Sequence, residues 1–230
     1  MGGGWFSEGT AVCLRGCVTE IVSLSATRFI NNSATEGAAI YLLSAARHVL
    51  SDVEWIGNYG LSSENYIHSD AIVSRGAAVY CGLLGMNISI DGATMLDNVA
   101  EEASAISIRS SIFTASLTIS NSHIEDSVSE TMLKFRHIPQ WSITILNSTI
   151  WGVVFFSNGA SVVADRTNFS TLTIEDGGSL QLAGAEVEGL TLQYASPCVG
   201  SSEVIASSGS QVKLYQPTDY SSSHLSAHML

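Results

Sequence analysis

The chain has 230 residues and a formal net charge of −12, with nine Lys and Arg against 21 Asp and Glu. Hydrophobic residues make up 46% and charged residues only 13%, compared with ~25% charged in typical soluble domains, so the polarity comes mainly from Ser, Thr and Asn. This balance argues against intrinsic disorder, against a coiled coil and against nucleic acid as a partner.

Targeting, membrane and metal signals are weak. No apolar run approaches the ~20 residues of a membrane-spanning helix, so we expect no membrane span. The residues before and around Trp5 and Phe6 contain no basic segment and no apolar core, so no signal peptide is recognisable. The four cysteines are too few and too scattered for a disulfide scaffold, and we expect no metal and no other cofactor.

An eight-residue pattern starts at residue 22 and recurs along the chain. Its first, third and eighth positions are apolar, as in Val22, Leu24 and Phe29. A weaker copy starts at residue 49 (Val49, Ser51 and Ile56), and further copies start at residues 88, 117, 143, 162 and 180. The second position is mostly polar, as on the outward face of a strand.

The fifth position predicts a sharp corner between two short strands. It is occupied by Ala26, Val53, Gly92, Asn121, Asn147, Arg166 and Gly184. Gly and Asn are the residues that best tolerate the left-handed backbone conformation. Each copy therefore predicts a strand, a one-residue left-handed corner and a second strand.

Repetition of this unit every 18 to 39 residues predicts an all-β fold. We expect a right-handed parallel β-helix, or solenoid, of about seven to nine rungs. A Greek-key sandwich is the alternative, but it gives no reason for three positions to stay in register along the chain. We expect one domain over residues 1–216, inserted loops near 59–75 and 193–208, and a loose C-terminal tail over 217–230.

The pattern also predicts which side chains stack. One inward stack should contain Val22, Ile88, Leu117, Ile143, Val162 and Leu180, and a second should contain Phe29, Met95, Ile124 and Ile150. Where the second strand ends, Asn31, Asn58, Asp97 and Asp126 should share a column. Asn amides in such a column can form a hydrogen-bonded ladder.

Two tetrapeptides resemble those of a known family. Phe29–Asn32 and Met95–Asn98 have the form Phe-x-x-Asn, with Met for Phe in the second case, while Gly37–Ile40 and Gly76–Val79 approach Gly-Gly-Ala-Ile. Residues 22–110 thereby resemble the repeat of polymorphic outer-membrane proteins, autotransporter-type surface proteins whose passenger is a right-handed parallel β-helix. The resemblance implies structural roles for Phe29, Asn32, Gly37, Ile40, Gly76, Val79, Met95 and Asn98. It also implies adhesion as the function and an extracellular or cell-surface location.

We therefore expect a non-catalytic module for adhesion or scaffolding that binds a glycan or a surface protein. The longest expected insertion carries the candidate binding residues Tyr59, Tyr66, His68, Asp70 and Arg75, which suit sugar stacking or protein contact. We also expect the chain to be part of a longer repeat protein or to associate end to end, because exposed solenoid ends are normally covered.

The alternative is a polysaccharide-active enzyme, either a lyase or a hydrolase. Asp97 and Asp126 share a column on adjacent rungs in this register, ~5 Å apart, which is the best carboxylate pair in the sequence. The small number of basic residues argues against a cleft for polyanionic sugars. The sequence favours a non-enzyme but leaves the enzyme open.

Overall fold

Parallel pairing of short strands organises the chain. A computed structural model describes residues 12–15, 21–34, 39–43, 47–60, 79–82, 87–100, 103–109, 115–125, 133–136, 141–156, 160–175, 179–193, 203–207, 209–215 and 226–229. Within these residues there is no helix, and every strand pair is parallel. The expected all-β class is therefore confirmed, and the described part of the chain contains no helix that could span a membrane.

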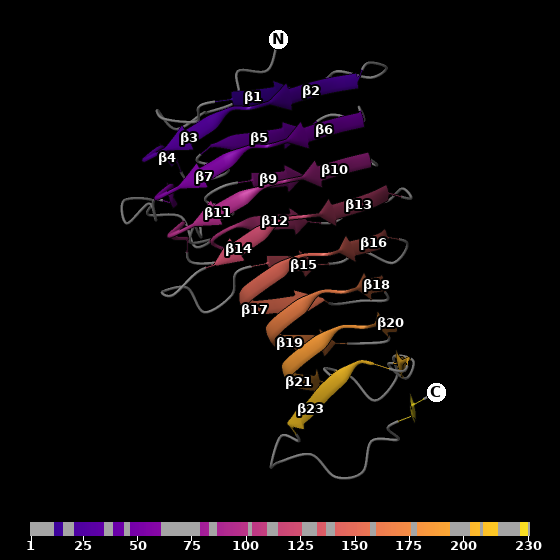
Figure 1. The fold of residues 1–230 in the computed structure, drawn as a ribbon. Coiled ribbons are helices and arrows are strands. Elements are labelled where there is room, and N and C mark those ends of the chain that lie inside the picture. The colour runs from indigo at the N-terminus through magenta and orange to yellow at the C-terminus, as the bar shows by residue number, and fades with distance from the viewer. Residues whose placement is uncertain are drawn as a thin grey trace, which may run out of the picture.

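One sheet has nine strands, stacked in chain order (Figure 1). Its strands are β2 (Ile21–Ser25), β6 (Arg47–Ser51), β10 (Asn87–Asp91), β13 (Ala115–Ser120), β16 (Trp141–Leu146), β18 (Ser161–Asp165), β20 (Ser179–Ala183), β22 (Glu203–Ala206) and β24 (Ser226–Met229). The order of the strands across the sheet is their order along the chain. Segments about 20 to 40 residues apart in the sequence therefore lie side by side.

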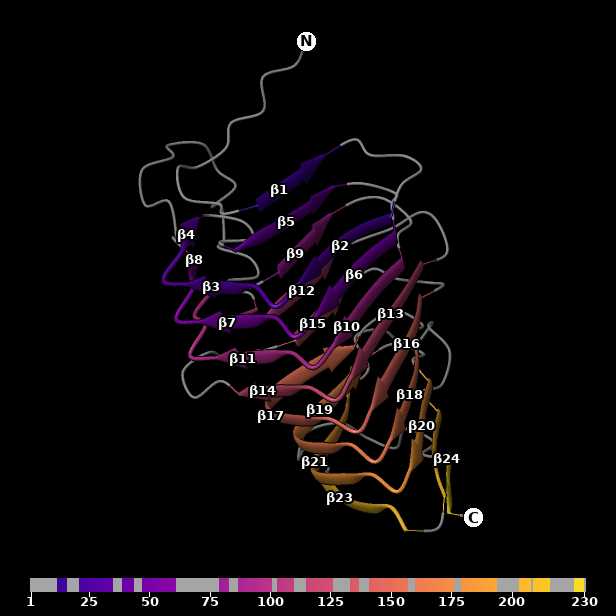
Figure 2. The same cartoon turned by 45° about the horizontal axis from the view of Figure 1, so that its top comes forward.

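A second sheet has thirteen strands in two series that meet at one long strand (Figure 2). The first series is β1 (Val12–Arg15), β5 (Ile40–Leu43), β9 (Val79–Gly82), β12 (Ile106–Arg109) and β15 (Leu133–Arg136). The second is β3 (Arg28–Ile30), β7 (Glu54–Ile56), β11 (Thr94–Leu96) and β14 (His123–Glu125). The strand β17 (Thr149–Phe156) pairs with both β14 and β15, and β19 (Asn168–Glu175), β21 (Glu186–Gln193) and β23 (Gln211–Tyr215) follow it. A small third sheet pairs β4 (Ser33–Ala34) with β8 (Tyr59–Gly60).

Both expected stacks are register columns of these sheets. In the nine-stranded sheet the partners are Val22, His48, Ile88, Leu117, Ile143, Val162, Leu180 and Val204. In the other sheet they are Phe29, Trp55, Met95, Ile124, Ile150, Phe169, Val187 and Val212. Of the ten side chains expected inside, nine are buried and Val22 is half-buried.

The register predicted for the copy that starts at residue 49 is wrong by one residue. His48 and Leu50 lie in the inward columns and are buried, as is Trp55, whereas Val49 and Ile56 are only partly buried. Side chains alternate across a strand, so a one-residue shift moves the whole set to the other face. The polar His48 stands at an inward position, and the apolar Val49 and Ile56 face outward. A pattern based on apolar residues therefore predicted the wrong register here.

The predicted left-handed corners are confirmed, with one shift that follows from the same error. Positive φ angles occur at Ala26, Asp52, Gly92, Asn121, Asn147, Arg166 and Gly184, so Asp52 takes the place expected for Val53. A second column of positive φ contains Asn31, Gly57 and Asp97. Asn58 is therefore not in the column of Asn31 and Asp97, as the sequence register had placed it.

An amide ladder joins three equivalent positions, of which two are buried and Asn32 is half-buried. Asn32, Asn58 and Asn98 close the tetrapeptides 29–32, 55–58 and 95–98. The Asn32 Nδ2 donates to Asn58 Oδ1 at 2.8 Å, and the Asn58 Nδ2 donates to Asn98 Oδ1 at 2.8 Å. The expected amide ladder is present, but it is built by the last residue of the Phe-x-x-Asn motif rather than by the residue before it.

The expected loops and tail contain strands in part. Tyr59–Gly60 forms β8, β22 lies within the expected insertion 193–208, and β24 lies within the expected tail 217–230. Val204 continues the inward column next to Leu180. The short segment 203–206 shows the apolar pattern of the repeat only weakly. Of the Gly-Gly-Ala-Ile-like motifs, Ile40 and Val79 are buried register partners, while Gly37 and Gly76 lie outside the described residues.

We expect Gly92→Ala to lower the free energy of unfolding by about 2 kcal/mol, because the Cβ of an alanine clashes with the backbone in the left-handed conformation. The φ angle of Gly92 is +65°, and an added Cβ would lie 2.6 Å from Asp52 Oδ1. Ala26 occupies an equivalent corner at φ +47°, so Ala26→Gly should leave stability unchanged or raise it by about 0.5 kcal/mol. Urea denaturation of the two variants would measure the contrast, and equal losses would contradict the assigned corners.

Candidate functional site

The outer face of the nine-stranded sheet carries two columns of mostly hydroxyl and amide side chains. The first column contains Asn87, Ser116, Ser142, Ser161 and Ser179, and the second contains Ser89, Thr118, Thr144, Val163 and Gln181. None of these side chains is buried. Neighbouring members of a column lie one strand apart, ~4.8 Å, which produces a regular polar surface.

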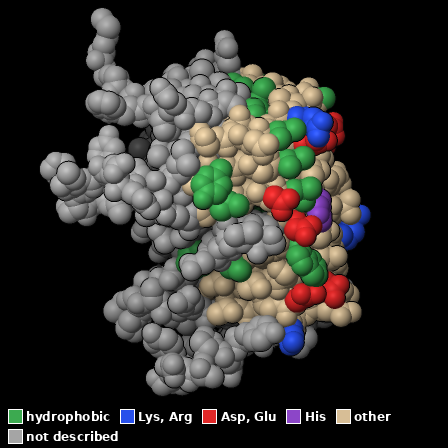
Figure 3. Space-filling model, turned by 90° about the vertical axis from the view of Figure 1, so that its left-hand side faces the viewer, with side chains coloured by type: hydrophobic (Ala, Val, Ile, Leu, Met, Phe, Trp, Pro, Cys, Tyr) green, Lys and Arg blue, Asp and Glu red, His purple; other side chains and the backbone are tan. Residues whose placement is uncertain are grey.

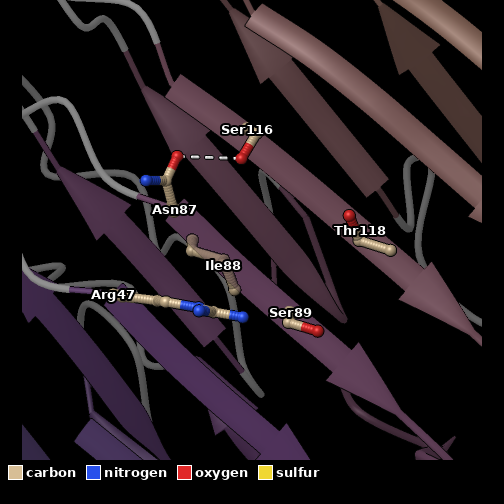
Figure 4. A pocket seen from close by; sticks show the side chains of 6 residues that line it. All are labelled: Arg47, Asn87, Ile88, Ser89, Ser116 and Thr118. Carbon is tan, nitrogen blue, oxygen red and sulfur yellow. Dashed lines mark hydrogen bonds between the residues drawn. The ribbon is translucent and has the colours of Figure 1, made fainter. Parts of the chain in front are cut away.

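A depression of about 330 Å³ lies at the β6, β10 and β13 end of this face (Figure 4). Its lining residues are Arg47, Asn87, Ile88, Ser89, Ser116 and Thr118. Ser116 Oγ donates a hydrogen bond of 2.8 Å to Asn87 Oδ1 across the β10–β13 pair. Figure 4 shows the Arg47 side chain lying beside Ile88 and reaching toward Ser89.

The chemistry of this depression suits hydrogen bonding to a polar ligand. The exposed Arg47 guanidinium offers donors in a planar fork and has no acceptor, while the Ser and Thr hydroxyls both donate and accept. Among the described residues that line it there is no carboxylate or imidazole that could act as a general base. The arrangement can bind and orient hydroxyl or carboxylate groups.

A polar network follows the corners at one edge of the same sheet. Asp91 Oδ1 accepts hydrogen bonds from Ser120 Oγ at 2.6 Å and from Asn121 Nδ2 at 2.8 Å. The Asn147 Nδ2 continues the chain by donating to Asn121 Oδ1 at 2.8 Å. The hydrogen bond from Ser120, and then that from Asn121, lower the pKa of the Asp91 carboxyl below its ordinary value of 3.8, against a small opposing effect of burial.

This lowered pKa predicts a pH-dependent contribution to stability. Because the folded pKa lies below 3.8, the charged Asp91 stabilises the fold above that pH, and the contribution is lost as the pH falls through the folded value. The difference in unfolding free energy between the wild type and Asp91→Asn should therefore shrink between about pH 5 and about pH 2. NMR titration of the carboxyl in Asn121→Ala should give a higher pKa than in the wild type. An unchanged pKa would contradict the network.

Most of the binding residues expected from the sequence lie outside the described part of the chain. Tyr59 is described: it is 51% exposed and pairs with Ser33 in the small sheet. Tyr66, His68, Asp70 and Arg75 are outside the described residues, so their grouping with Tyr59 stays a prediction.

The expected carboxylate pair is placed only in part. Asp97 is exposed at a left-handed corner, and Asp126 is outside the described residues. Two further carboxylates, Asp91 and Asp165, fall in one column of the nine-stranded sheet, but Ser120 and Leu146 lie between them. No group of three or more His, Cys, Asp or Glu side chains within the described ranges could hold a metal ion.

Sequence reasoning missed Arg47 as a site residue. The only signal is that it opens the strand before His48, in a column that continues with Asn87 and then Ser116. The one-residue error in that copy of the repeat hid this position. Comparisons with protein-family models, with curated proteins and with solved structures found no match to this chain.

Proposed function

We propose that the chain winds as a right-handed parallel β-helix of about seven to nine rungs, similar to the repeat of polymorphic outer-membrane proteins. The columns of register partners in both sheets and the repeated left-handed corners support this winding. Parallel crossover connections are nearly always right-handed, which favours that hand.

The β-helix serves as a non-catalytic binding module at the cell surface or outside the cell. Its ligand is a glycan, and the outer face of the nine-stranded sheet is the binding surface. The observation that carries this proposal is the double column of hydroxyl and amide side chains, with the Arg47 depression at one end.

A repeating polar surface suits a repeating polar polymer. Each hydroxyl contact contributes little on its own, because it replaces a hydrogen bond to water. Many equivalent contacts on one rigid sheet add up when the same chain of sugars lies across several of them. A surface of this kind binds without a deep pocket, and the depression at the Arg47 end of the face is open to solvent.

Affinity electrophoresis in gels containing xylan, a soluble cellulose derivative, pectin or alginate tests the proposal. At least one of these polysaccharides should retard the wild type. Thr118→Leu removes a hydroxyl and places a larger apolar side chain among the hydroxyl columns, and it should weaken that retardation several-fold. The matched control is Thr94→Leu, at a half-buried position on the outer face of β11 in the other sheet, which should bind like the wild type.

Two outcomes would overturn the proposal. If Thr118→Leu and Thr94→Leu bind equally well, the nine-stranded sheet is not the binding face. If the wild type releases reducing or unsaturated sugars from any of the four polysaccharides, and Asp97→Ala abolishes that release, the chain is a polysaccharide-active enzyme instead.

A further inference from the structure

An apolar stripe runs along the outer face of the thirteen-stranded sheet, on the opposite side of the strands from the core. Ile30, Ile56 and Leu96 are register partners on β3, β7 and β11, and the column continues with Glu125 and Trp151. Ile30 is 44% exposed and Trp151 is 45% exposed, whereas Ile56 and Leu96 are partly buried. Figure 3 shows this line of apolar side chains on the surface.

Exposed carboxylates surround the Trp151 end of the stripe. Glu125 is the direct register partner of Trp151, and Glu186 and Glu188 lie on β21, two strands further along. Asp97 follows Leu96 at the corner and is also exposed. In Figure 3 acidic side chains lie on both sides of apolar ones on this face.

Few positive charges balance these carboxylates within the described residues. His123 lies 3.1 Å from Glu125, and Lys213 lies on β23 beside the strand that carries Glu188. Arg28 pairs with Glu54 on β3 and β7, away from Trp151, and Arg166, at the corner before β19, pairs with Asp165. The Trp151 end of the stripe is therefore acidic, in keeping with the net charge of −12.

We propose that this stripe is a docking surface for a basic, amphipathic segment of a partner protein. The indole face of Trp151 attracts a Lys or Arg side chain through a cation–π interaction, and Glu125 and Glu188 supply complementary charge. Ile30, Ile56 and Leu96 receive the apolar side chains of the same segment. This surface is separate from the hydroxyl columns and does not depend on the proposed glycan binding.

The charge of the surface selects this occupant over three others. Anionic lipid surfaces and nucleic acids would be repelled by the carboxylates around Trp151. A second copy of the chain docking by the same face would set like charges against each other. A basic segment is the occupant for which both the apolar and the acidic parts of the stripe are favourable.

Fluorescence anisotropy with two labelled helical peptides tests the proposal on the full chain. One probe is built from Leu and Lys, and the other has Glu at every Lys position. The Leu/Lys probe should bind, with an affinity that falls as salt is added, and the Leu/Glu probe should not. Trp151→Ser should weaken binding roughly tenfold, and Glu125→Gln with Glu188→Gln should weaken it several-fold.

The control is Asp165→Asn, which removes one negative charge from the nine-stranded sheet and should bind the probe like the wild type. An unchanged thermal transition in Trp151→Ser would show that the fold is intact, as expected for an exposed side chain. Equal binding of both probes, wild-type affinity in Trp151→Ser, or an equal loss in Asp165→Asn would each overturn the proposal.

Discussion

Replacement of Trp55 by alanine should lower the free energy of unfolding by roughly 4 kcal/mol, the cost typical of truncating a buried aromatic residue. Trp55 is fully buried and stacks on Phe29, with ring centroids 6.0 Å apart and an interplanar angle of 13°. Met95 lies beside it in the same inward column. Truncation would leave a large cavity between two neighbours that are themselves held by their strands.

The adjacent residue provides the matched control. Ile56 lies on the outward side of the same strand, so Ile56→Ala should cost no more than about 1 kcal/mol. Trp55→Phe should also cost far less than Trp55→Ala, because it keeps a ring on Phe29 and removes an indole N–H for which the described residues offer no acceptor. Urea denaturation of the three variants gives the comparison. A larger loss for Ile56→Ala than for Trp55→Ala would contradict the register.

Truncation of Asn58 should cost about 3 kcal/mol, because the substitution removes several hydrogen bonds inside the fold at once. Its Oδ1 accepts from the Asn32 backbone N–H at 3.1 Å as well as from the Asn32 amide, and its Nδ2 also donates to the Phe29 carbonyl at 3.0 Å. Asn58 is fully buried, so water cannot replace these partners in Asn58→Ala.

An exposed asparagine outside the ladder provides the reference for this change. Asn168 is exposed at the start of β19, and Asn168→Ala should change stability by less than about 0.5 kcal/mol. Thermal unfolding of both variants, followed by circular dichroism, would measure the difference. If Asn58→Ala were as mild as Asn168→Ala, the ladder would contribute no net stability.

The local pattern predicted the strands and corners well wherever inward positions are apolar. Ile88, Leu117, Ile143, Val162 and Leu180 repeat at one position, and the structure places them in one column. The residue types at the corners were also informative, since Gly and Asn occupy four of the seven left-handed positions in the first column of corners. These signals are local and depend only on side-chain alternation and backbone sterics.

Prediction failed where an inward residue is polar or an outward residue is apolar. His48 is buried in a column of aliphatic side chains, while Ile56 faces outward, so the apolar count preferred the wrong register. The Arg47 depression was missed for the same reason. Its lining residues come from strands about 30 to 40 residues apart, and only the correct alignment of β6 with β10 brings them together.

The apolar stripe around Trp151 could not be found from the repeat alone. Its members belong to the outward position of the second strand, which varies from Ile30 to Glu125 without a constant residue type. Side-chain exposure at that position depends on the neighbouring segments, not on the local pattern. The three-dimensional arrangement is therefore needed to recognise it.

Distances between spin labels on the outer face of the nine-stranded sheet test the parallel stacking most directly. Ser23, Ser89, Thr144 and Gln181 belong to one outward column, and labels would be attached at cysteines introduced there in a background without the four native cysteines. Four strand steps separate Ser23 from Thr144 and Ser89 from Gln181, and six separate Ser23 from Gln181. Both four-step pairs should give distances of about 19 Å and the six-step pair about 29 Å, since each step adds ~4.8 Å. A distance from Ser23 to Gln181 that is shorter than that from Ser23 to Thr144 would contradict the stacked parallel sheet.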